Sequence, residues 1–209
     1  RILGEMRRHA VQRHRPVCTF NMCDEPRVRE NTERIVASVK FLKRAAPELR
    51  IAGSYSVDFR TNNDPLALQT LFRTMDASIL NDHDEAVMAE GRRLKKDLYM
   101  YNQGRSRYVF GAYLYAERAK GIKGFLQWHM FATHGYQFFD LDGREPDDGV
   151  IAVTARGVRP TLDLERCRQG VNDFRCFLTL ERLLARAEEA GRDEAAAPGR
   201  AFLRELTAK

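Results

Sequence analysis

The chain has 209 residues, 44% hydrophobic and 31% charged, which suits one globular domain or a large part of one. Its 35 basic residues are spread along the chain and interleaved with 29 acidic ones. Despite a formal charge of +6, we therefore expect a mixed solvated surface and no nucleic-acid partner. No stretch approaches the roughly 20 apolar residues of a membrane span, so no membrane partner is expected, and no signal peptide is visible.

The first residues indicate that material upstream is missing. Arg1 stands where a Met would, and the sequence opens inside a helix-like pattern that includes Ile2, Leu3 and Met6. The sequence therefore assigns no cellular location.

The four cysteines give no framework for disulfides or metal. Cys18 and Cys23 lie on opposite faces of a predicted strand, and Cys167 and Cys176 are nine residues apart, about 180° around a helix. No CxxC or paired Cys/His spacing occurs. We expect buried structural cysteines, no metal site and no cofactor.

Residues 17–26, VCTFNMCDEP, are the most informative stretch. A short apolar run ends in Asp24, Glu25 and Pro26, and an amphipathic helix pattern with Ile35 and Val39 on one face follows. A (β/α) barrel presents catalytic acids in this way, at the carboxyl end of a strand. Alternation predicts an inner face with Thr19, Asn21, Cys23 and Glu25 and an outer face with Cys18, Phe20, Met22 and Asp24.

The same residues also fit a helix start without chemistry. Asp24 is a good N-cap, Glu25 favours the positive end of a helix dipole, and Pro26 fits the first helical position. These residues alone do not decide between the two interpretations.

Strand and helix patterns alternate as far as residue 131. The further predicted strands are 50–56, 76–82, 98–104 and 124–131, and the predicted helices begin at Asp64-Pro65, His83 and Ser106. In the last of these helices, Tyr108, Ala112, Tyr115 and Ala119 recur at helical spacing. Short loops between such units indicate right-handed βαβ connections and a parallel sheet.

Each predicted strand ends in polar or aromatic residues, which favours the C-terminal part of a (β/α)8 barrel with about five βα units. A doubly wound sheet is the second choice, because no GxGxxG or P-loop supports it. An eight-stranded barrel needs three more strands, which we expect from an upstream segment or a second chain. The edge of the 17–23 strand would otherwise be apolar and uncovered.

The C-terminal part is mainly helical. Residues 134–148 form a polar loop that fits no EF-hand spacing, and residues 149–155 a short β segment. Residues 161–189 give the longest helix pattern, with Leu164, Cys167, Val171, Phe174 and Leu178 as its core-facing stripe. We assign residues 1–190 to one catalytic barrel domain and 191–209 to a peripheral tail with a short helical piece.

This long helix also carries a recognisable pattern, formed by Pro160, Thr161, Glu165, Arg168, Gly170, Asp173, Arg175 and Leu180-Glu181. The pattern resembles the end of the catalytic domain in glycoside hydrolase family 123 and its uncharacterised relatives. Asn172 replaces an acidic residue of the family pattern, and Phe174 and Cys176 replace tyrosines. The upstream order is also similar, from a strand ending in Asp-Glu-Pro through a helix led by Arg107, so the resemblance spans residues 15–185.

The resemblance implies a retaining β-N-acetylgalactosaminidase-like enzyme that acts on N-acetyl-β-hexosaminides. In such enzymes the 2-acetamido oxygen of the substrate attacks the anomeric carbon, in place of a protein nucleophile. Glu25 matches the family position of the proton donor, and Asp24 would orient and polarise the acetamido N–H. The donor must be protonated and the orienting group ionised, so the two carboxylates need different surroundings.

Side chains at the predicted strand ends are the candidates for holding the sugar. Trp128 offers a ring platform, and the candidates for binding hydroxyls are Tyr55, Asn81, Asp82, Tyr101 and His129. Three functions stay open: an active glycosidase, a catalytically degenerate carbohydrate-binding relative on the same fold, and a basic surface that binds nucleic acid or acidic glycans.

Overall fold

The structure is a computed structural model and describes residues 2–15, 19–26, 29–55, 65–81, 83–127, 131–132 and 148–208. The chain divides into two compact units. The first comprises Arg1–Tyr101 and Gly121–Gly124, and the second comprises Asn102–Lys120 and Phe125–Lys209.

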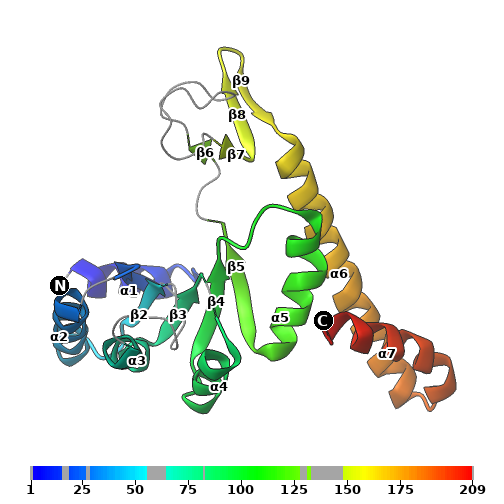
Figure 1. Cartoon of the computed structure of the whole chain (residues 1–209), viewed down its shortest axis with the longest axis horizontal. Helices are drawn as coiled ribbons and strands as arrows, with labels where there is room; N and C mark the ends of the chain where they lie inside the picture. Colours follow the sequence, from blue (N-terminus) through cyan, green and yellow to red (C-terminus); the bar gives the residue numbers. More distant parts are fainter. Residues whose placement is uncertain are drawn as a thin grey trace. The chain divides into compact units, whose positions relative to one another are not determined.

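Within the described residues, five parallel strands form one sheet, in the order β1-β2-β3-β4-β5 (Figure 1). They are β1 (Thr19–Asp24), β2 (Arg50–Tyr55), β3 (Ala77–Leu80), β4 (Asp97–Tyr101) and β5 (Ile122–Leu126). The five predicted strands are present, but β4 ends at Tyr101 rather than at 104, and β5 begins two residues earlier than predicted and ends at Leu126 rather than at 131. Because the strand order follows the chain without a reversal, these strands lack the switch point of a doubly wound sheet.

In the first unit, helix α1 (Ile2–Gln12) precedes β1, and three further helices connect the strands β1 to β4. They are α2 (Arg29–Ala45), α3 (Pro65–Thr74) and α4 (Glu85–Arg93). The N-cap of α4 is Asp84, whose carboxylate accepts a hydrogen bond from the Val87 N–H at 2.8 Å. The core of the unit is apolar, and its most buried side chains include Val39, Leu71, Phe72, Met88, Leu98 and Met100.

The predicted faces of β1 are wrong because the strand contains a β-bulge. Between Asn21 and Asp24, β1 has one residue more than the paired part of β2. The Asn21 Nδ2 donates a hydrogen bond to Ser54 Oγ at 2.8 Å. A Cβ added at Gly53, the preceding residue of β2, would lie 2.7 Å from Cys23 Sγ. Because Gly53 and Ser54 point to opposite faces of β2, Asn21 and Cys23 do so as well.

In the second unit, a π-helix interrupts the helix predicted from Ser106. The π-helix η1 (Val109–Tyr113) leads directly into α5 (Leu114–Lys120). A π-turn closes i→i+5 hydrogen bonds and so contains one residue more than an α-turn, which rotates all later side chains. Tyr108 is therefore 59% exposed whereas Tyr115 is 4% exposed, although α-helical spacing predicts a shared face.

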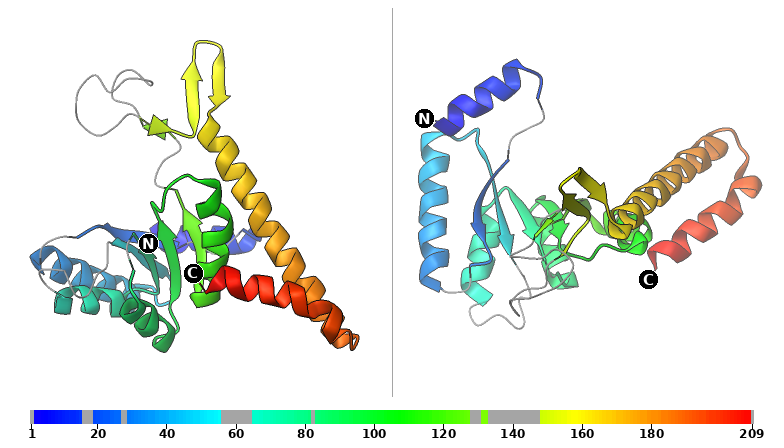
Figure 2. Two further views of the ribbon diagram at one scale, coloured as in Figure 1. Left: turned by 45° about the vertical axis from the view of Figure 1, so that its right-hand side comes forward. Right: turned by 90° about the horizontal axis from the view of Figure 1, so that it is seen from above.

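The longest helix is α6 (Leu162–Glu189), which begins after its N-cap Thr161. It is followed by α7 (Asp193–Thr207), and the two helices pack side by side (Figure 2). The sequence predicts a peripheral tail here, but Ala196 and Leu203 of α7 are buried. The expectation overlooks that α7 has its own apolar stripe, which α6 covers.

Two short antiparallel pairs complete the second unit. Strand β6 (Phe131–Ala132) pairs with β7 (Asp148–Gly149), and β8 (Ile151–Thr154) pairs with β9 (Gly157–Pro160). The predicted β segment at 149–155 is thus the first strand of a hairpin.

The cysteines differ in exposure. Cys167 is buried and Cys23 is half-buried, but Cys176 is exposed, so the prediction of burial is wrong for Cys176. Cys18 lies outside the described residues.

Candidate active site

Three of the predicted site residues meet at the carboxyl ends of β1, β3 and β4. The Tyr101 hydroxyl donates a hydrogen bond to Glu25 Oε1 at 2.5 Å. The Asn81 Nδ2 donates to the same oxygen at 3.4 Å. Both donors are more than 50 residues from Glu25 in sequence, so only the parallel sheet brings them to the carboxylate.

The backbone of β2 fixes two members of this cluster. The Glu25 N–H donates to the Ser54 carbonyl at 2.8 Å, and the Asn81 N–H donates to the Tyr55 carbonyl at 3.1 Å. Glu25 has a φ of 42°, in the left-handed region that non-glycine residues rarely adopt. Such strain at a strand end is typical of functional residues, because the surrounding structure must hold it in place.

The helix-start interpretation of residues 24–26 is not supported. Asp24 is the last residue of β1, and Glu25 continues the hydrogen bonding to β2 through its N–H. Pro26 is not helical, and the described part of α2 is Arg29–Ala45. Asp24 is exposed at the end of the strand, so it can reach a ligand there.

Ser54 and Asn21 are neighbours of the cluster that were not among the predicted site residues. Ser54 is 6% exposed, binds Glu25 through its carbonyl and accepts the Asn21 amide at its hydroxyl. A serine inside the apolar sequence of residues 50–55 was the available signal. Asn21 reaches this hydroxyl because it pairs with Ala52, which shares a face of β2 with Ser54, and this register leaves no such signal in the sequence.

Tyr55 does not join the cluster. It is 1% exposed, its ring meets Phe72 of α3 edge-on at a centroid distance of 6.4 Å, and its hydroxyl lies 2.6 Å from Ser78 Oγ. Tyr55 therefore belongs to the core of the first unit. Trp128, His129 and Asp82, the other predicted sugar-binding residues, lie outside the described residues.

Cys23 lies next to the two carboxylates, but its surroundings disfavour nucleophilic chemistry. Burial raises the pKa of the Cys23 thiol to about 12, against a weaker opposing effect of a hydrogen bond with the Ser54 backbone. At neutral pH the thiol stays protonated, and the thiol is a much poorer nucleophile than the thiolate. Among the described residues, no group of three or more His, Cys, Asp or Glu side chains could hold a metal ion.

A second polar cluster occupies the amino ends of the strands. Asp97 of β4 forms ion pairs with Arg50 of β2 and Lys123 of β5. Burial by itself would raise the pKa of Asp97, but hydrogen bonds from Lys123 and Arg50 hold it below its ordinary value of 3.8. This arrangement neutralises the carboxylate and cross-links three strands, which is a stabilising role.

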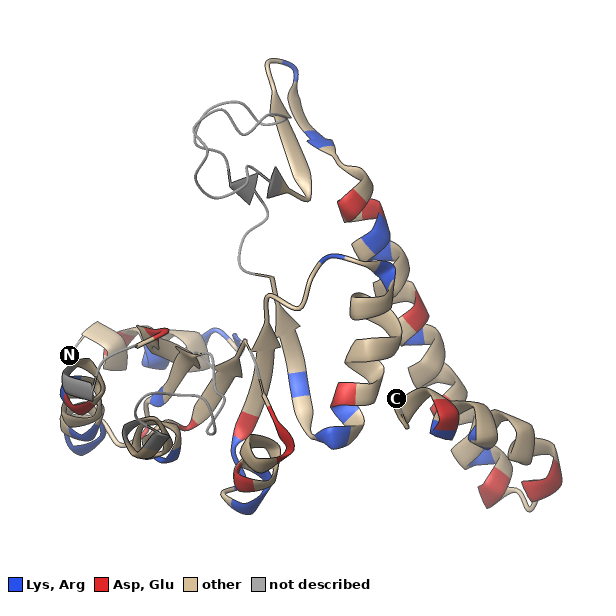
Figure 3. Cartoon of the chain, viewed as in Figure 1, with Lys and Arg blue, Asp and Glu red and all other residues tan. Residues whose placement is uncertain are grey.

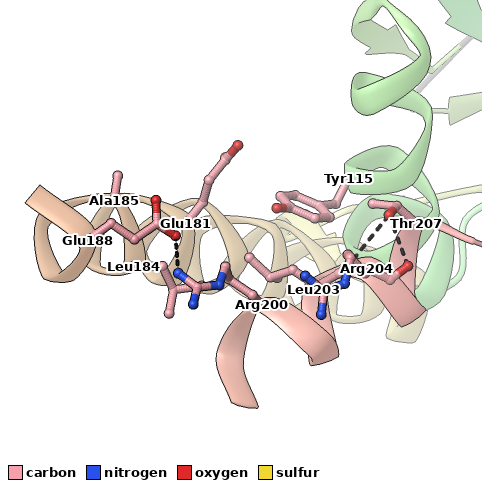
Figure 4. A pocket seen from close by; sticks show the side chains of 9 residues that line it. All are labelled: Tyr115, Glu181, Leu184, Ala185, Glu188, Arg200, Leu203, Arg204 and Thr207. Atoms are coloured by element: carbon pink, nitrogen blue, oxygen red, sulfur yellow. Dashed lines mark hydrogen bonds and ion pairs between the residues drawn. The ribbon is translucent and has the colours of Figure 1, made fainter. Parts of the chain in front are cut away.

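A cavity of about 360 Å³ lies between α5, α6 and α7 (Figure 4). Its volume is within the range of small-molecule pockets. Glu188 at its rim is paired with Arg200, and Glu181 with Arg118 at 3.2 Å. Because these carboxylates are tied to guanidinium groups, the cavity offers less acid–base chemistry than the Glu25 cluster.

The pattern that carries the family resemblance has a packing role in α6. Asp173 forms two hydrogen bonds with Arg107, from Nε at 2.6 Å and from Nη2 at 2.9 Å. A Cβ added at Gly170 would lie 2.5 Å from the Arg107 carbonyl oxygen. Gly170 is therefore required for the close approach of α6 to the segment that leads into η1.

Charges of both signs are interleaved on the helices, most clearly on α4 and α6 (Figure 3). Many of them are paired along one helix, as Arg168 is with Glu165. In the part of the chain that the structure describes, no helix is long and apolar enough to cross a membrane.

No family model, curated protein or solved structure matches this chain.

Proposed function

We propose that this protein is a retaining glycoside hydrolase that acts on N-acetyl-β-hexosaminides, with Glu25 as its proton donor. One observation carries the proposal: the Glu25 carboxylate stands at the carboxyl end of a parallel strand and is held there by Tyr101 and Asn81. A carboxylate fixed at this end of such a sheet is the usual position of a catalytic acid in barrel enzymes.

The five strands form part of a (β/α)8 barrel in this proposal. Two observations support it, namely the sequential strand order and the gathering of polar groups at one end of the sheet. β1 is an edge strand of the described sheet, so further strands from an upstream segment or a second chain would pair with it.

The proposed reaction has two steps. In the first, the 2-acetamido oxygen attacks the anomeric carbon, the glycosidic C–O bond breaks, and Glu25 gives its proton to the leaving oxygen. Asp24 orients the acetamido N–H and stabilises the positive charge of the cyclic intermediate. In the second, Glu25 takes a proton from a water whose oxygen attacks the same carbon, and the bond from that carbon to the acetamido oxygen breaks and restores the 2-acetamido group, so the original anomeric configuration is retained.

The arrangement around Glu25 suits these roles. Tyr101 and Asn81 both donate to Oε1, which fixes the carboxyl group in one orientation at the carboxyl ends of the strands. Tyr101 is only 3% exposed, so its hydroxyl is held by packing on the sheet. Because Glu25 is already held in one orientation, the reaction does not have to overcome the entropy cost of orienting the acid.

The test is nitrophenol release from nitrophenyl N-acetyl-β-galactosaminide and N-acetyl-β-glucosaminide. We expect turnover of at least one of them and none of the nitrophenyl β-galactoside with a 2-hydroxyl, because that sugar lacks the attacking acetamido group. Binding of the N-acetyl sugars without release would indicate a degenerate carbohydrate-binding protein. Equal turnover of both kinds of substrate would contradict the substrate-assisted mechanism.

A further inference from the structure

The π-helix η1 brings two tyrosines together that an α-helix would separate. Tyr108 and Tyr113 are five residues apart, which corresponds to about 140° around an α-helix. Their ring centroids are 6.1 Å apart, with an angle of 35° between the ring planes. A π-turn bonds residue i to residue i+5 and so places these two positions one above the other. Single π-turns inside α-helices are rare and frequently mark functional sites.

The paired rings are accessible and have polar groups beside them. Tyr108 is 59% exposed, and Tyr113 is half-buried. The Tyr113 hydroxyl donates a hydrogen bond to Gln103 Oε1 at 3.3 Å. A hydroxyl, an amide and two aromatic faces are thus gathered on one short segment of the second unit.

The opposite side of η1 is anchored to α6. A Cβ added at Gly111 would lie 3.2 Å from the Gly170 carbonyl oxygen and 3.1 Å from Asp173 Cβ, so the two helices touch through their backbones. The ion pair of Arg107 with Asp173 fixes the residue before Tyr108. The tyrosine pair therefore has a rigid support, which limits the entropy that a ligand would have to overcome.

We propose that Gln103, Tyr108 and Tyr113 form a carbohydrate-binding platform, on which the apolar face of a pyranose ring stacks while its hydroxyls bond to the amide and the phenol. Only the choice of sugar, an N-acetylhexosamine chain, rests on the proposed function. Stacked aromatics with a few convergent polar groups are the usual composition of sites that bind partly apolar, hydroxyl-rich rings.

The charges near the platform favour a sugar over a nucleobase. Proteins that stack single-stranded nucleic acid on aromatic rings also present cations that follow the phosphates. Here the neighbouring Arg107 is already paired with Asp173 through two hydrogen bonds. Arg107 is therefore not available to a phosphate group, whereas a neutral sugar needs no cation.

The test is calorimetric titration of the full chain with triacetylchitotriose in the Glu25→Gln background, which prevents turnover of the probe. We expect Tyr108→Ala to weaken binding about tenfold, the order expected for loss of one stacking ring. Tyr108→Phe keeps the ring and should bind as the parent does. Tyr113→Phe removes the bond to Gln103 and should weaken binding by a smaller factor.

Phe41→Ala is the matched control, because Phe41 of α2 is an exposed aromatic with a similar exposed fraction, 62%. It should leave the affinity unchanged. The platform is contradicted if Tyr108→Ala binds the trisaccharide as tightly as the parent, or if Phe41→Ala loses as much affinity. It is also contradicted if the parent binds single-stranded DNA rather than the trisaccharide and Tyr108→Ala abolishes that binding.

Failure of the platform and failure of the proposed function give different results. If nitrophenyl glycosides are not hydrolysed but Tyr108→Ala still weakens trisaccharide binding, the platform stands and the catalytic proposal fails. If nitrophenyl glycosides are hydrolysed but the parent does not bind the trisaccharide, the catalytic proposal stands and the platform fails.

Discussion

The two ends of the sheet hold their carboxylates in opposite ways. At the amino ends, Asp97 is bound by two cations, Arg50 and Lys123. At the carboxyl ends, Glu25 receives hydrogen bonds from two neutral groups, the Tyr101 hydroxyl and the Asn81 amide. Both arrangements join side chains from three different elements of one sheet.

The difference indicates that the amino ends of the strands stabilise the fold and that the carboxyl ends carry the chemistry. Two paired cations strongly favour the ionised form of a carboxylate, and the ion pairs that result hold the strands together. A carboxylate held by neutral donors is oriented but can still exchange a proton with a ligand. We therefore expect substitutions at the carboxyl ends to change rates and substitutions at the amino ends to change stability.

The largest effect is expected for Glu25→Gln. The amide keeps the shape of the side chain but cannot donate the proton, so hydrolysis of an N-acetylhexosamine disaccharide should slow by about 10²- to 10⁴-fold. Steady-state kinetics measures the loss. The melting temperature should stay close to that of the wild type, and a large fall in it would mean that Glu25 supports the fold instead.

Asp24→Asn should follow, with a loss of about 10²-fold on the disaccharide and on an aryl glycoside alike. The substitution removes the charge that stabilises the cyclic intermediate, and both substrates pass through that intermediate. Kinetics with the two substrates tests this equality. A loss confined to the disaccharide would assign Asp24 to leaving-group protonation.

Tyr101→Phe should reduce kcat about tenfold, since a hydrogen bond to a charged group contributes about 1.5–3 kcal/mol and Asn81 still holds the same oxygen. KM should change little, because the hydroxyl acts on Glu25 rather than on the sugar. If KM rises while kcat is unchanged, Tyr101 contacts the substrate and does not position the acid.

Asp97→Asn should have the smallest effect on rate and a clear effect on folding. The substitution removes the carboxylate charge that pairs with Arg50 and Lys123, which should lower the free energy of unfolding by about 1–3 kcal/mol at neutral pH. The side chain is only 16% exposed, so solvent screening is limited. Urea unfolding measures the change, and a tenfold loss of activity in this variant would contradict the division between the two ends.

The pH dependence of that stability has a definite sign. The pKa of Asp97 is lower in the folded chain than its ordinary value of 3.8, since the bonds from Lys123 and Arg50 outweigh burial. The contribution of ionised Asp97 to the free energy of unfolding is therefore present above pH 3.8 and is lost as the pH falls through the pKa of Asp97 in the folded chain. Acid unfolding curves should show a larger loss of stability in the wild type than in Asp97→Asn, because other carboxylates with lowered pKa values, such as Glu90 and Asp173, remain in the variant.

Sequence patterns predicted the sheet well because its signals are local. Apolar runs that end in polar residues marked β1 to β4, and Asp-Glu-Pro marked the end of β1. The meeting of Glu25 with Asn81 and Tyr101 followed from one general fact, that parallel strands bring their carboxyl ends to one edge.

The errors have equally specific causes. The bulge in β1 and the π-turn at 109–113 each add one residue to a regular repeat, and every side chain after such a residue changes face. Tyr55 was placed at the site by its position at a strand end, but its ring contacts Phe72 and it became part of the core. Tertiary packing decides such cases, and periodicity does not report it.

The most direct test of the central claim is the dependence of kcat/KM on leaving-group pKa, measured with a series of aryl N-acetyl-β-hexosaminides for wild type and Glu25→Gln. If Glu25 protonates the leaving oxygen, the variant should lose little with acidic phenols and progressively more with basic ones, whereas the wild type should show a shallow dependence. An identical dependence in both proteins would contradict the assignment of Glu25 as the acid.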